Sequence, residues 1–277
     1  MDRVIELRRE LHQIPELGYQ EKKTQAFIMD FLRSVGLSPK PVATTGVWAK
    51  IGEGKPIIAF RADMDALPIE EKTDLPYKST HPGKMHACGH DAHMAILLAF
   101  AEVAVKQRYS GTIHLIFQPS EEVPPGGAKS ILEEGVLEGV EFIFGLHNDP
   151  SIPTGKIRLK TGTIMASSTE FTITLHGKGG HGASPHLAKD PIVGASALVL
   201  ALQQIASRIL PPTEPFVLTI GKLSAGTAFN IIPETATLGG TTRTVDEETT
   251  ILVKQEVEKI TTSTAKAYGL SVEIEWG

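Results

Sequence analysis

The sequence predicts an α/β protein whose mostly parallel sheet carries helices on both faces, followed by a smaller α+β domain. Apolar runs of strand length alternate with helical segments in the first part of the chain, as they do in parallel sheets with crossover helices. From about residue 168 the order becomes β-α-β-β-α-β, which is typical of a ferredoxin-like sandwich. We therefore place a first domain at residues 1–167 and a second at residues 168–277.

Helix and strand signals follow one another regularly in the first domain. Asp2 can cap a first helix that ends before Pro15, and Gly36 is a C-terminal stop for the second helix. The apolar run at residues 57–60 is typical of a strand buried on both faces of a sheet. The expected helices cover residues 2–14, 21–35, 91–107 and 126–134, and the expected strands cover residues 46–51, 56–62, 111–118 and 140–146.

In the second domain, Asp190-Pro191 is a favourable N-cap and first-turn pair for a long helix that Pro211-Pro212 closes. Asp246 begins a further helix. The expected helices cover residues 192–209 and 246–269, and the expected strands cover residues 170–176, 216–224, 236–242 and 271–275.

Bulk composition excludes several classes of protein. The 27 basic and 32 acidic residues leave a formal charge of −5, which gives no reason to expect nucleic acid or an anionic membrane as partner. One cysteine excludes an internal disulfide, and we expect no hydrophobic stretch of transmembrane length. The charged amino terminus lacks a signal-peptide core, so we expect a cytoplasmic protein.

Residues 85–94, Met-His-Ala-Cys-Gly-His-Asp-Ala-His-Met, concentrate potential metal ligands at the start of a helix. Cys88 and His90 can turn toward one metal ion because Gly89 permits a tight turn between them. The alternative is a buried thiol beside ordinary loop histidines. His86 and His93 are expected to be structural, although both lie close enough to Cys88 and His90 to contact and orient the ligands.

Other candidate residues follow the predicted strands, where ligands bind in open α/β sheets. In Glu121-Glu122, one carboxylate can bind a metal while its neighbour acts as general base; a solvated acidic turn is the alternative. His147 is either a neutral-imidazole ligand or a structural histidine. Asp65 either orients a ligating histidine or caps a turn, and Arg61 and Asp63 can pair with each other.

The second domain offers a possible set of substrate-binding residues. His181 lies in a glycine-rich loop that can present it to a ligand. Asn230 can hold a carbonyl group, and Arg243 can bind a carboxylate, although such an arginine is more often a surface salt-bridge residue. Together they indicate a domain that covers a metal site.

These residues stand in motifs that resemble the M20 metallopeptidase clan, and the cysteine-ligand branch in particular. That branch includes hippurate hydrolases, N-acyl-amino-acid amidohydrolases, carboxypeptidases, auxin-conjugate hydrolases and N-acetyldiaminopimelate deacetylases. The matching motifs span both domains in family order and lie at residues 7–12, 15–16, 61–68, 85–93, 117–122, 145–147, 177–181 and 230–233.

The resemblance implies a zinc-peptidase-like catalytic domain and a lid or dimerisation domain. Cys88, His90, Glu122 and His147 would hold two divalent metal ions, which could be zinc, manganese, cobalt or nickel, and Glu121 would be the general base. His181 would reach the active site of the partner subunit in a homodimer formed through residues 168–277. Asn230 and Arg243 would contact substrate there.

Members of this family continue beyond the second domain and return to complete the first. The returning segment supplies a fifth metal ligand, a histidine. Because the sequence ends at Gly277, we expect either a fragment or a naturally short protein. If nothing replaces that segment, one metal site lacks a ligand and the first domain exposes apolar surface.

The sequence thus predicts a metal-dependent amidohydrolase that cleaves N-acyl amino acids or related small amides with a free carboxylate. A carboxypeptidase or dipeptidase on the same scaffold is the alternative among enzymes. The alternative from another class is an inactive dimeric module that binds metal or ligand.

Overall fold

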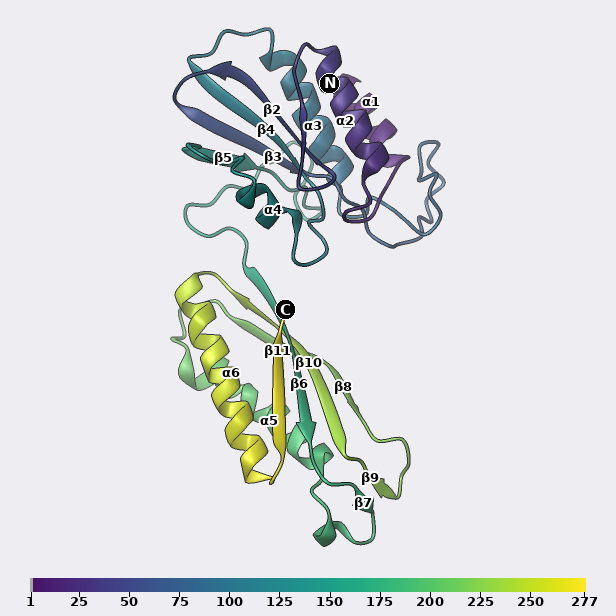
Figure 1. Ribbon diagram of the computed structural model, residues 1–277, viewed down its shortest axis with the longest axis vertical. Helices are drawn as coiled ribbons and strands as arrows, with labels where there is room; N and C mark the ends of the chain where they lie inside the picture. The colour runs from purple at the N-terminus through teal and green to yellow at the C-terminus, as the bar shows by residue number, and fades with distance from the viewer. Residues whose placement is uncertain (1) are drawn as a thin grey trace. The chain divides into compact units, whose positions relative to one another are not determined.

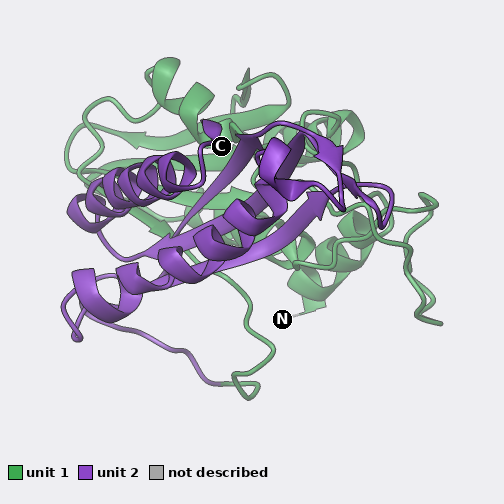
Figure 2. Ribbon diagram, turned by 90° about the horizontal axis from the view of Figure 1, so that it is seen from below, with its two compact units in different colours: residues 1–155 green, residues 156–277 purple. Residues whose placement is uncertain are grey.

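The computed structural model describes residues 2–277. The chain forms two compact units that divide between Gly155 and Lys156, each with its own hydrophobic core (Figure 2). The sequence analysis places the domain boundary later, between residues 167 and 168. Residues 156–166, which form neither helix nor strand, lie between these two positions.

The first unit has a sheet of strand order β1-β2-β4-β3-β5 (Figure 1). Strand β3 is parallel to β4 and β5, whereas β2 is antiparallel to β4 and pairs with β1 as an edge hairpin. The predicted α/β class is confirmed, with this hairpin as an antiparallel addition. The strands are β1 (Lys40–Val42), β2 (Gly46–Glu53), β3 (Ile57–Asp63), β4 (Gly111–Gln118) and β5 (Phe142–Gly145).

Helices cover both faces of this sheet, as predicted. The buried side chains of α1, α2 and α3 share one core with Val47, Leu115 and Phe117 on one face of the sheet. On the opposite face, Ile131 of α4 packs with Ile116. The helices are α1 (Asp2–His12), α2 (Lys22–Ser34), α3 (His90–Ala104) and α4 (Gly127–Glu133).

Strand β4 is buried along its whole length, including its polar residues Thr112, His114 and Gln118. By contrast, β5 is an edge strand, and the side chains of Phe142, Ile143 and Phe144 are all more than half exposed. This agrees with the expectation of exposed apolar surface on the first domain.

The second unit is an antiparallel sheet of order β11-β6-β10-β8 packed against α5 and α6 (Figure 1). The predicted β-α-β-β-α-β order is confirmed, and Asp190 and Asp246 cap their helices through bonds to the amides of Ile192 and Thr249. Short β7 and β9 pair separately. The elements are β6 (Ser167–His176), β7 (Gly180–His181), α5 (Pro191–Leu202), β8 (Val217–Ala225), β9 (Ile231–Ile232), β10 (Thr235–Thr244), α6 (Glu247–Ala267) and β11 (Ser271–Trp276).

The expectation that no hydrophobic stretch reaches transmembrane length is wrong. The helical stretch Pro191–Ile209 is long and apolar enough to cross a membrane by length and composition alone. It contains α5 and a π-helical turn at Ile205–Ile209. Leu198, Leu202 and Ile205 are fully buried in the core of the second unit, whereas Val193 and Leu200 are at least half exposed, so packing against the sheet uses only part of its apolar surface.

Two residues of α3 provide a test of this packing. Leu98 is fully buried between the helices and the sheet, whereas the Val103 side chain of the same helix is 59% exposed. We expect Leu98→Ala to lower the free energy of unfolding by about 2–5 kcal/mol because it leaves a cavity. Val103→Ala should change it by less than about 0.5 kcal/mol. Chemical denaturation measures both, and equal effects would contradict the packing described.

Candidate metal centre

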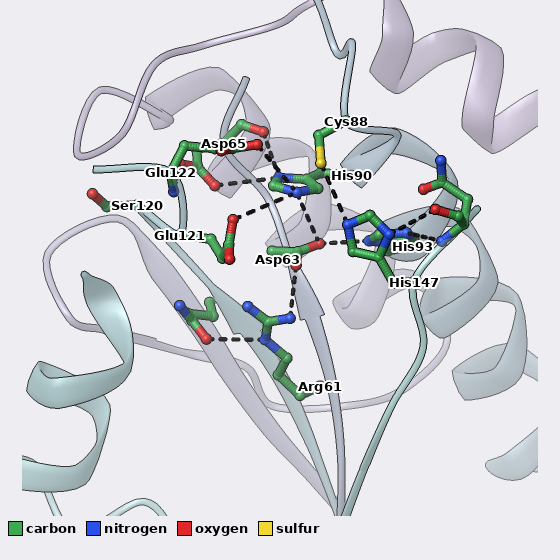
Figure 3. A network of polar contacts seen from close by, with 12 residues as sticks. Arg61, Asp63, Asp65, Cys88, His90, His93, Ser120, Glu121, Glu122 and His147 are labelled. Carbon is green, nitrogen blue, oxygen red and sulfur yellow. Dashed lines mark hydrogen bonds and ion pairs between the residues drawn. The ribbon is translucent and has the colours of Figure 1, made fainter. Parts of the chain in front are cut away.

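Metal-binding side chain types converge at one edge of the sheet in the first unit (Figure 3). Asp63 ends β3, His90 begins α3, and Glu121 and Glu122 follow β4. His147 follows β5. Parallel strands deliver their carboxyl ends to the same edge, which is why residues so distant in sequence meet here.

The Cys88–His90 turn depends on Gly89. This glycine has φ +85°, in the left-handed region that favours glycine, and a Cβ atom on it would lie 2.3 Å from Oδ1 of Asn148. The turn brings the Cys88 Sγ atom to 3.4 Å from Nε2 of His147. Glycine is therefore required both for the backbone conformation and for the approach of the loop that carries His147.

Both histidines have their unprotonated ring nitrogen directed into the cluster. The Nδ1–H group of His90 donates to the carbonyl oxygen of Asp65 (2.8 Å), and that of His147 donates to the carbonyl oxygen of Asn148 (2.6 Å). A carbonyl oxygen only accepts, so in the neutral form of each ring the proton is on Nδ1 and Nε2 carries the lone pair. A metal-ligating histidine is held by its other nitrogen in this way.

The Nε2 atom of His90 lies 3.8 Å from Oε1 of Glu122, 3.9 Å from Oε2 of Glu121 and 3.7 Å from Oδ1 of Asp63. Neither this nitrogen nor Oε1 of Glu122 has a hydrogen-bond partner among residues 2–277, although both are buried. Buried polar atoms normally have partners. A divalent cation between them fits these residues.

The charge balance of the cluster also favours a cation. Burial, together with the charges of Glu122, Glu121 and Asp63, raises the pKa of Cys88 to about 12. Burial and the Glu122 charge also raise the pKa of Glu121. Metals bind the thiolate form of cysteine. A nearby divalent ion would favour that form and so lower the pKa of Cys88.

Within residues 2–277, the donor atoms of three groups lie close enough to hold a metal ion. The first is Cys88 with His90 and His147, and the second is His90 with Glu121 and Glu122. The sulfur, nitrogen and oxygen donors suit zinc and neighbouring transition metals. The third group consists of Asp63, His90 and His93.

Asp65 lies directly beside the cluster. Its Oδ1 atom is 3.3 Å from Nδ1 of His90, and its Oδ2 atom accepts a hydrogen bond from the amide of Glu122 (2.9 Å). Burial acts to raise the pKa of Asp65, but the bonds from His90 and from the amides of Glu122 and Glu121 outweigh it, so the pKa is lowered. The charged carboxylate therefore joins His90 to the acidic turn.

The sequence predicts a structural His93 near the ligands, and the structure places it in contact with Asp63 and with the loop of His147. The Nδ1–H group of His93 donates to Asp63 (2.6 Å), and its Nε2 accepts from the amide of Asn148 (3.1 Å), next to His147. Asp63 also accepts from Arg61 (2.7 Å), which is the pairing considered from the sequence. The spacing of His90 and His93, three residues apart on a helix, already indicated a shared face.

Asp91 connects the first turn of α3 to helix α1. Its buried carboxylate accepts hydrogen bonds from Arg8 (2.7 Å) and His12 (2.8 Å) of α1. The bond to Asp91 is the largest contribution that raises the pKa of His12. Helix α1 thus holds the residue that follows His90.

In the second unit, His181 and Asn230 lie together. His181 lies on β7, and the amide of Gly182 donates to the carbonyl oxygen of Asn230 (2.8 Å). His181 also lines an open pocket of about 530 Å³ with Gly179, Gly180 and residues 231–234.

Arg243 does not join this pair within the second unit. It lies eight residues beyond Thr235, near the opposite end of β10 from the pocket, which at about 3.3 Å per residue is roughly 26 Å along the strand. Its guanidinium donates to the hydroxyl of Thr241 and to the carbonyl oxygen of Thr242.

The fold and this cluster define a metal-dependent hydrolase. A sequence model of Peptidase family M20/M25/M40 matches residues 59–263, and the chain belongs to this family. Divalent metal binding accords with a similar solved structure, a dinuclear metal binding peptidase of the M20 family from Bacillus subtilis. That structure is 39% identical, with a TM-score of 0.84 over 99% of this chain and 73% of the other.

Curated relatives include deacetylases and carboxypeptidases. The N-acetyl-L-cysteine deacetylase of Bacillus subtilis (strain 168) is 47% identical over 99% of this chain and 67% of its own length. Thermostable carboxypeptidase 1 of Saccharolobus solfataricus is 42% identical over 99% of this chain and 72% of its own length. The chain thus spans about two thirds to three quarters of the proteins it resembles.

Two glycines with the same backbone conformation test the Cys88–His90 turn. Gly89 has φ +85° and faces Asn148, whereas Gly54 has φ +84° and no described atom within 4 Å of an added Cβ. Each alanine substitution should cost about 1–2 kcal/mol of unfolding free energy through left-handed strain. Only Gly89→Ala should also weaken zinc binding, by about tenfold or more, as measured by calorimetry. Equal zinc affinities would refute the role of this turn.

Proposed function

We propose that this chain is an amidohydrolase that uses two divalent metal ions to cleave N-acyl amino acids or related small amides bearing a carboxylate. The observation that carries the proposal is the difference between two adjacent carboxylates. Oε1 of Glu122 is buried without a hydrogen-bond partner among residues 2–277, while the side chain of Glu121 is 41% exposed beside it. One is suited to hold an ion and the other to exchange protons with solvent or substrate.

The proposed ligands are Cys88, His90, Glu122 and His147. Zinc, manganese, cobalt and nickel are all compatible with this mixture of sulfur, nitrogen and oxygen donors. When bound, such ions polarise a substrate carbonyl and lower the pKa of water. His93 and Asp65 hold the loop of His147 and the ring of His90, respectively.

Glu121 acts as the general base in this proposal. Burial and the Glu122 charge raise its pKa, which favours a carboxylate that takes a proton and later returns it. Glu121 accepts the proton of the attacking water and then donates it to the nitrogen of the leaving amine. The acyl–nitrogen bond breaks as the amine leaves, and the products are a carboxylic acid and an amino acid.

Substrate contacts and assembly are also proposals. We infer that the second unit mediates a homodimer and that His181 stabilises the oxyanion in the active site of the partner subunit. The exposed position of His181 beside Asn230 and an open pocket supports a role in ligand binding. The role of Arg243 as a substrate contact is supported by the family resemblance alone. A cytoplasmic location stays a prediction from the sequence.

A carboxypeptidase acting on the same site is the second candidate, because thermostable carboxypeptidase 1 is among the relatives. An inactive binding module is less well supported, since Glu121 would then serve no purpose.

Substitution of each glutamate separates their roles. Glu121→Gln should retain bound metal but lower kcat by about 10²–10⁴-fold, because the base is lost. Glu122→Gln should lose both metal and activity, because a ligand is lost. Metal analysis and kinetics on the zinc- or manganese-loaded protein provide the measurement. Undiminished turnover by Glu121→Gln would refute the mechanism.

A substrate panel separates the functions. The metal-loaded chain should hydrolyse acetyl- and benzoyl-amino acids with kcat/KM at least about tenfold above that for dipeptides, a difference of about 1.4 kcal/mol in transition-state binding. A preference for dipeptides would favour the carboxypeptidase. No turnover with zinc, manganese, cobalt or nickel would favour the binding module.

A further inference from the structure

A buried carboxylate that is not one of the proposed metal ligands contacts the residue just before the Glu121–Glu122 turn. Glu21 is fully buried at the N-cap position of α2, but its side chain does not cap that helix. Instead, Oε1 accepts the backbone N–H of Ser120 (2.8 Å), and Oε2 accepts the hydroxyl of Thr45 (2.6 Å). Glu21 thereby joins the start of α2, the turn before β2 and the exit of β4.

Ser120 is the residue at which the chain turns from β4 toward Glu121 (Figure 3). It has φ +47°, a conformation that residues other than glycine rarely adopt. Such a conformation persists only when its surroundings hold it. The Ser120 carbonyl accepts from the amide of Gly127 (3.0 Å) and its hydroxyl donates to the carbonyl of Val123 (3.2 Å), while Glu21 holds its amide.

Two buried carboxylates therefore accept hydrogen bonds from the backbone amides on either side of Glu121. Glu21 accepts the amide of Ser120 before it, and Asp65 accepts the amide of Glu122 after it (2.9 Å). Asp65 also contacts His90, so it belongs to the cluster. The Glu21 carboxylate instead accepts hydrogen bonds from Thr45 and Ser120, neither of which is a proposed metal ligand.

We propose that Glu21 is a positioning residue that holds Ser120 in its left-handed conformation and so aims Glu121 and Glu122 into the metal centre. This inference rests on the proposed function for its effect on turnover, but its effect on metal affinity is independent of catalysis. A residue that supports metal ligands from behind typically contributes a factor of about 10–100 in metal affinity or activity.

Glu16 provides a matched control for general destabilisation. Its carboxylate is also buried and also accepts two hydrogen bonds near the start of α2, from the amide (2.9 Å) and hydroxyl (3.0 Å) of Thr24. Removing it costs the fold a comparable pair of bonds, and neither of these bonds is made to Ser120.

The test compares Glu21→Ala, Glu21→Gln and Glu16→Ala in the full chain, using zinc affinity by calorimetry and the kcat and KM for an acetyl-amino acid. We expect Glu21→Ala to weaken zinc binding about 10–100-fold and to lower kcat by a similar factor. Glu21→Gln should stay within about threefold of the unsubstituted chain, because its amide oxygen can still accept from Ser120. Glu16→Ala should also stay within about threefold in both measurements.

Two results would overturn the inference: zinc affinity unchanged in Glu21→Ala, or an equal loss in Glu16→Ala. If Glu21→Ala does not fold, Glu21→Asp replaces it, because aspartate keeps the charge but is one methylene too short to reach the Ser120 amide. Normal zinc affinity in folded Glu21→Asp would then overturn it. An unsubstituted chain that binds zinc but hydrolyses no amide would contradict the proposed function, while the affinity comparison would still decide the role of Glu21.

Discussion

The hydrogen bond from Nδ1 of His90 to the carbonyl oxygen of Asp65 determines what the rest of the cluster can do. It leaves Nε2 buried among the carboxylates of Asp63, Glu121 and Glu122 with no hydrogen-bond partner in residues 2–277. A buried acceptor such as Oε1 of Glu122, close to further carboxylates, is costly unless a positive charge lies beside it. The Gly89 turn and the Glu121–Glu122 turn hold these groups in place. The arrangement they maintain favours the binding of a cation.

Much of the fold and part of the site could be predicted from the sequence, because local patterns carry them. Apolar runs and caps located the main helices and strands, and strand ends indicated where Glu122 and His147 would meet the Cys88–His90 turn. Parallel strands share an edge, so polar residues that follow them gather without any knowledge of their contacts. Gly89 was predictable for the same reason, since a tight turn between two ligands requires it.

The remaining features depend on contacts between distant segments that no local pattern encodes. Glu21 lies 99 residues from Ser120 in the sequence. Only the folded structure shows that its side chain accepts the Ser120 amide instead of capping α2. The pairing of His93 with Asp63 depends likewise on how α3 lies against β3. Arg243 was grouped with His181 by residue type, but the length of β10 keeps the two apart within the second unit.

The central claim is that this cluster is a metal centre with a cysteine ligand, and X-ray absorption spectroscopy of the zinc-loaded protein tests it most directly. Cys88 is the only cysteine, so a thiolate ligand can be assigned without ambiguity. The account predicts zinc–sulfur scattering at about 2.3 Å beside nitrogen and oxygen ligands at about 2.0–2.2 Å, with the sulfur contribution lost in Cys88→Ser. A zinc spectrum with only nitrogen and oxygen ligands in the unsubstituted chain would contradict it.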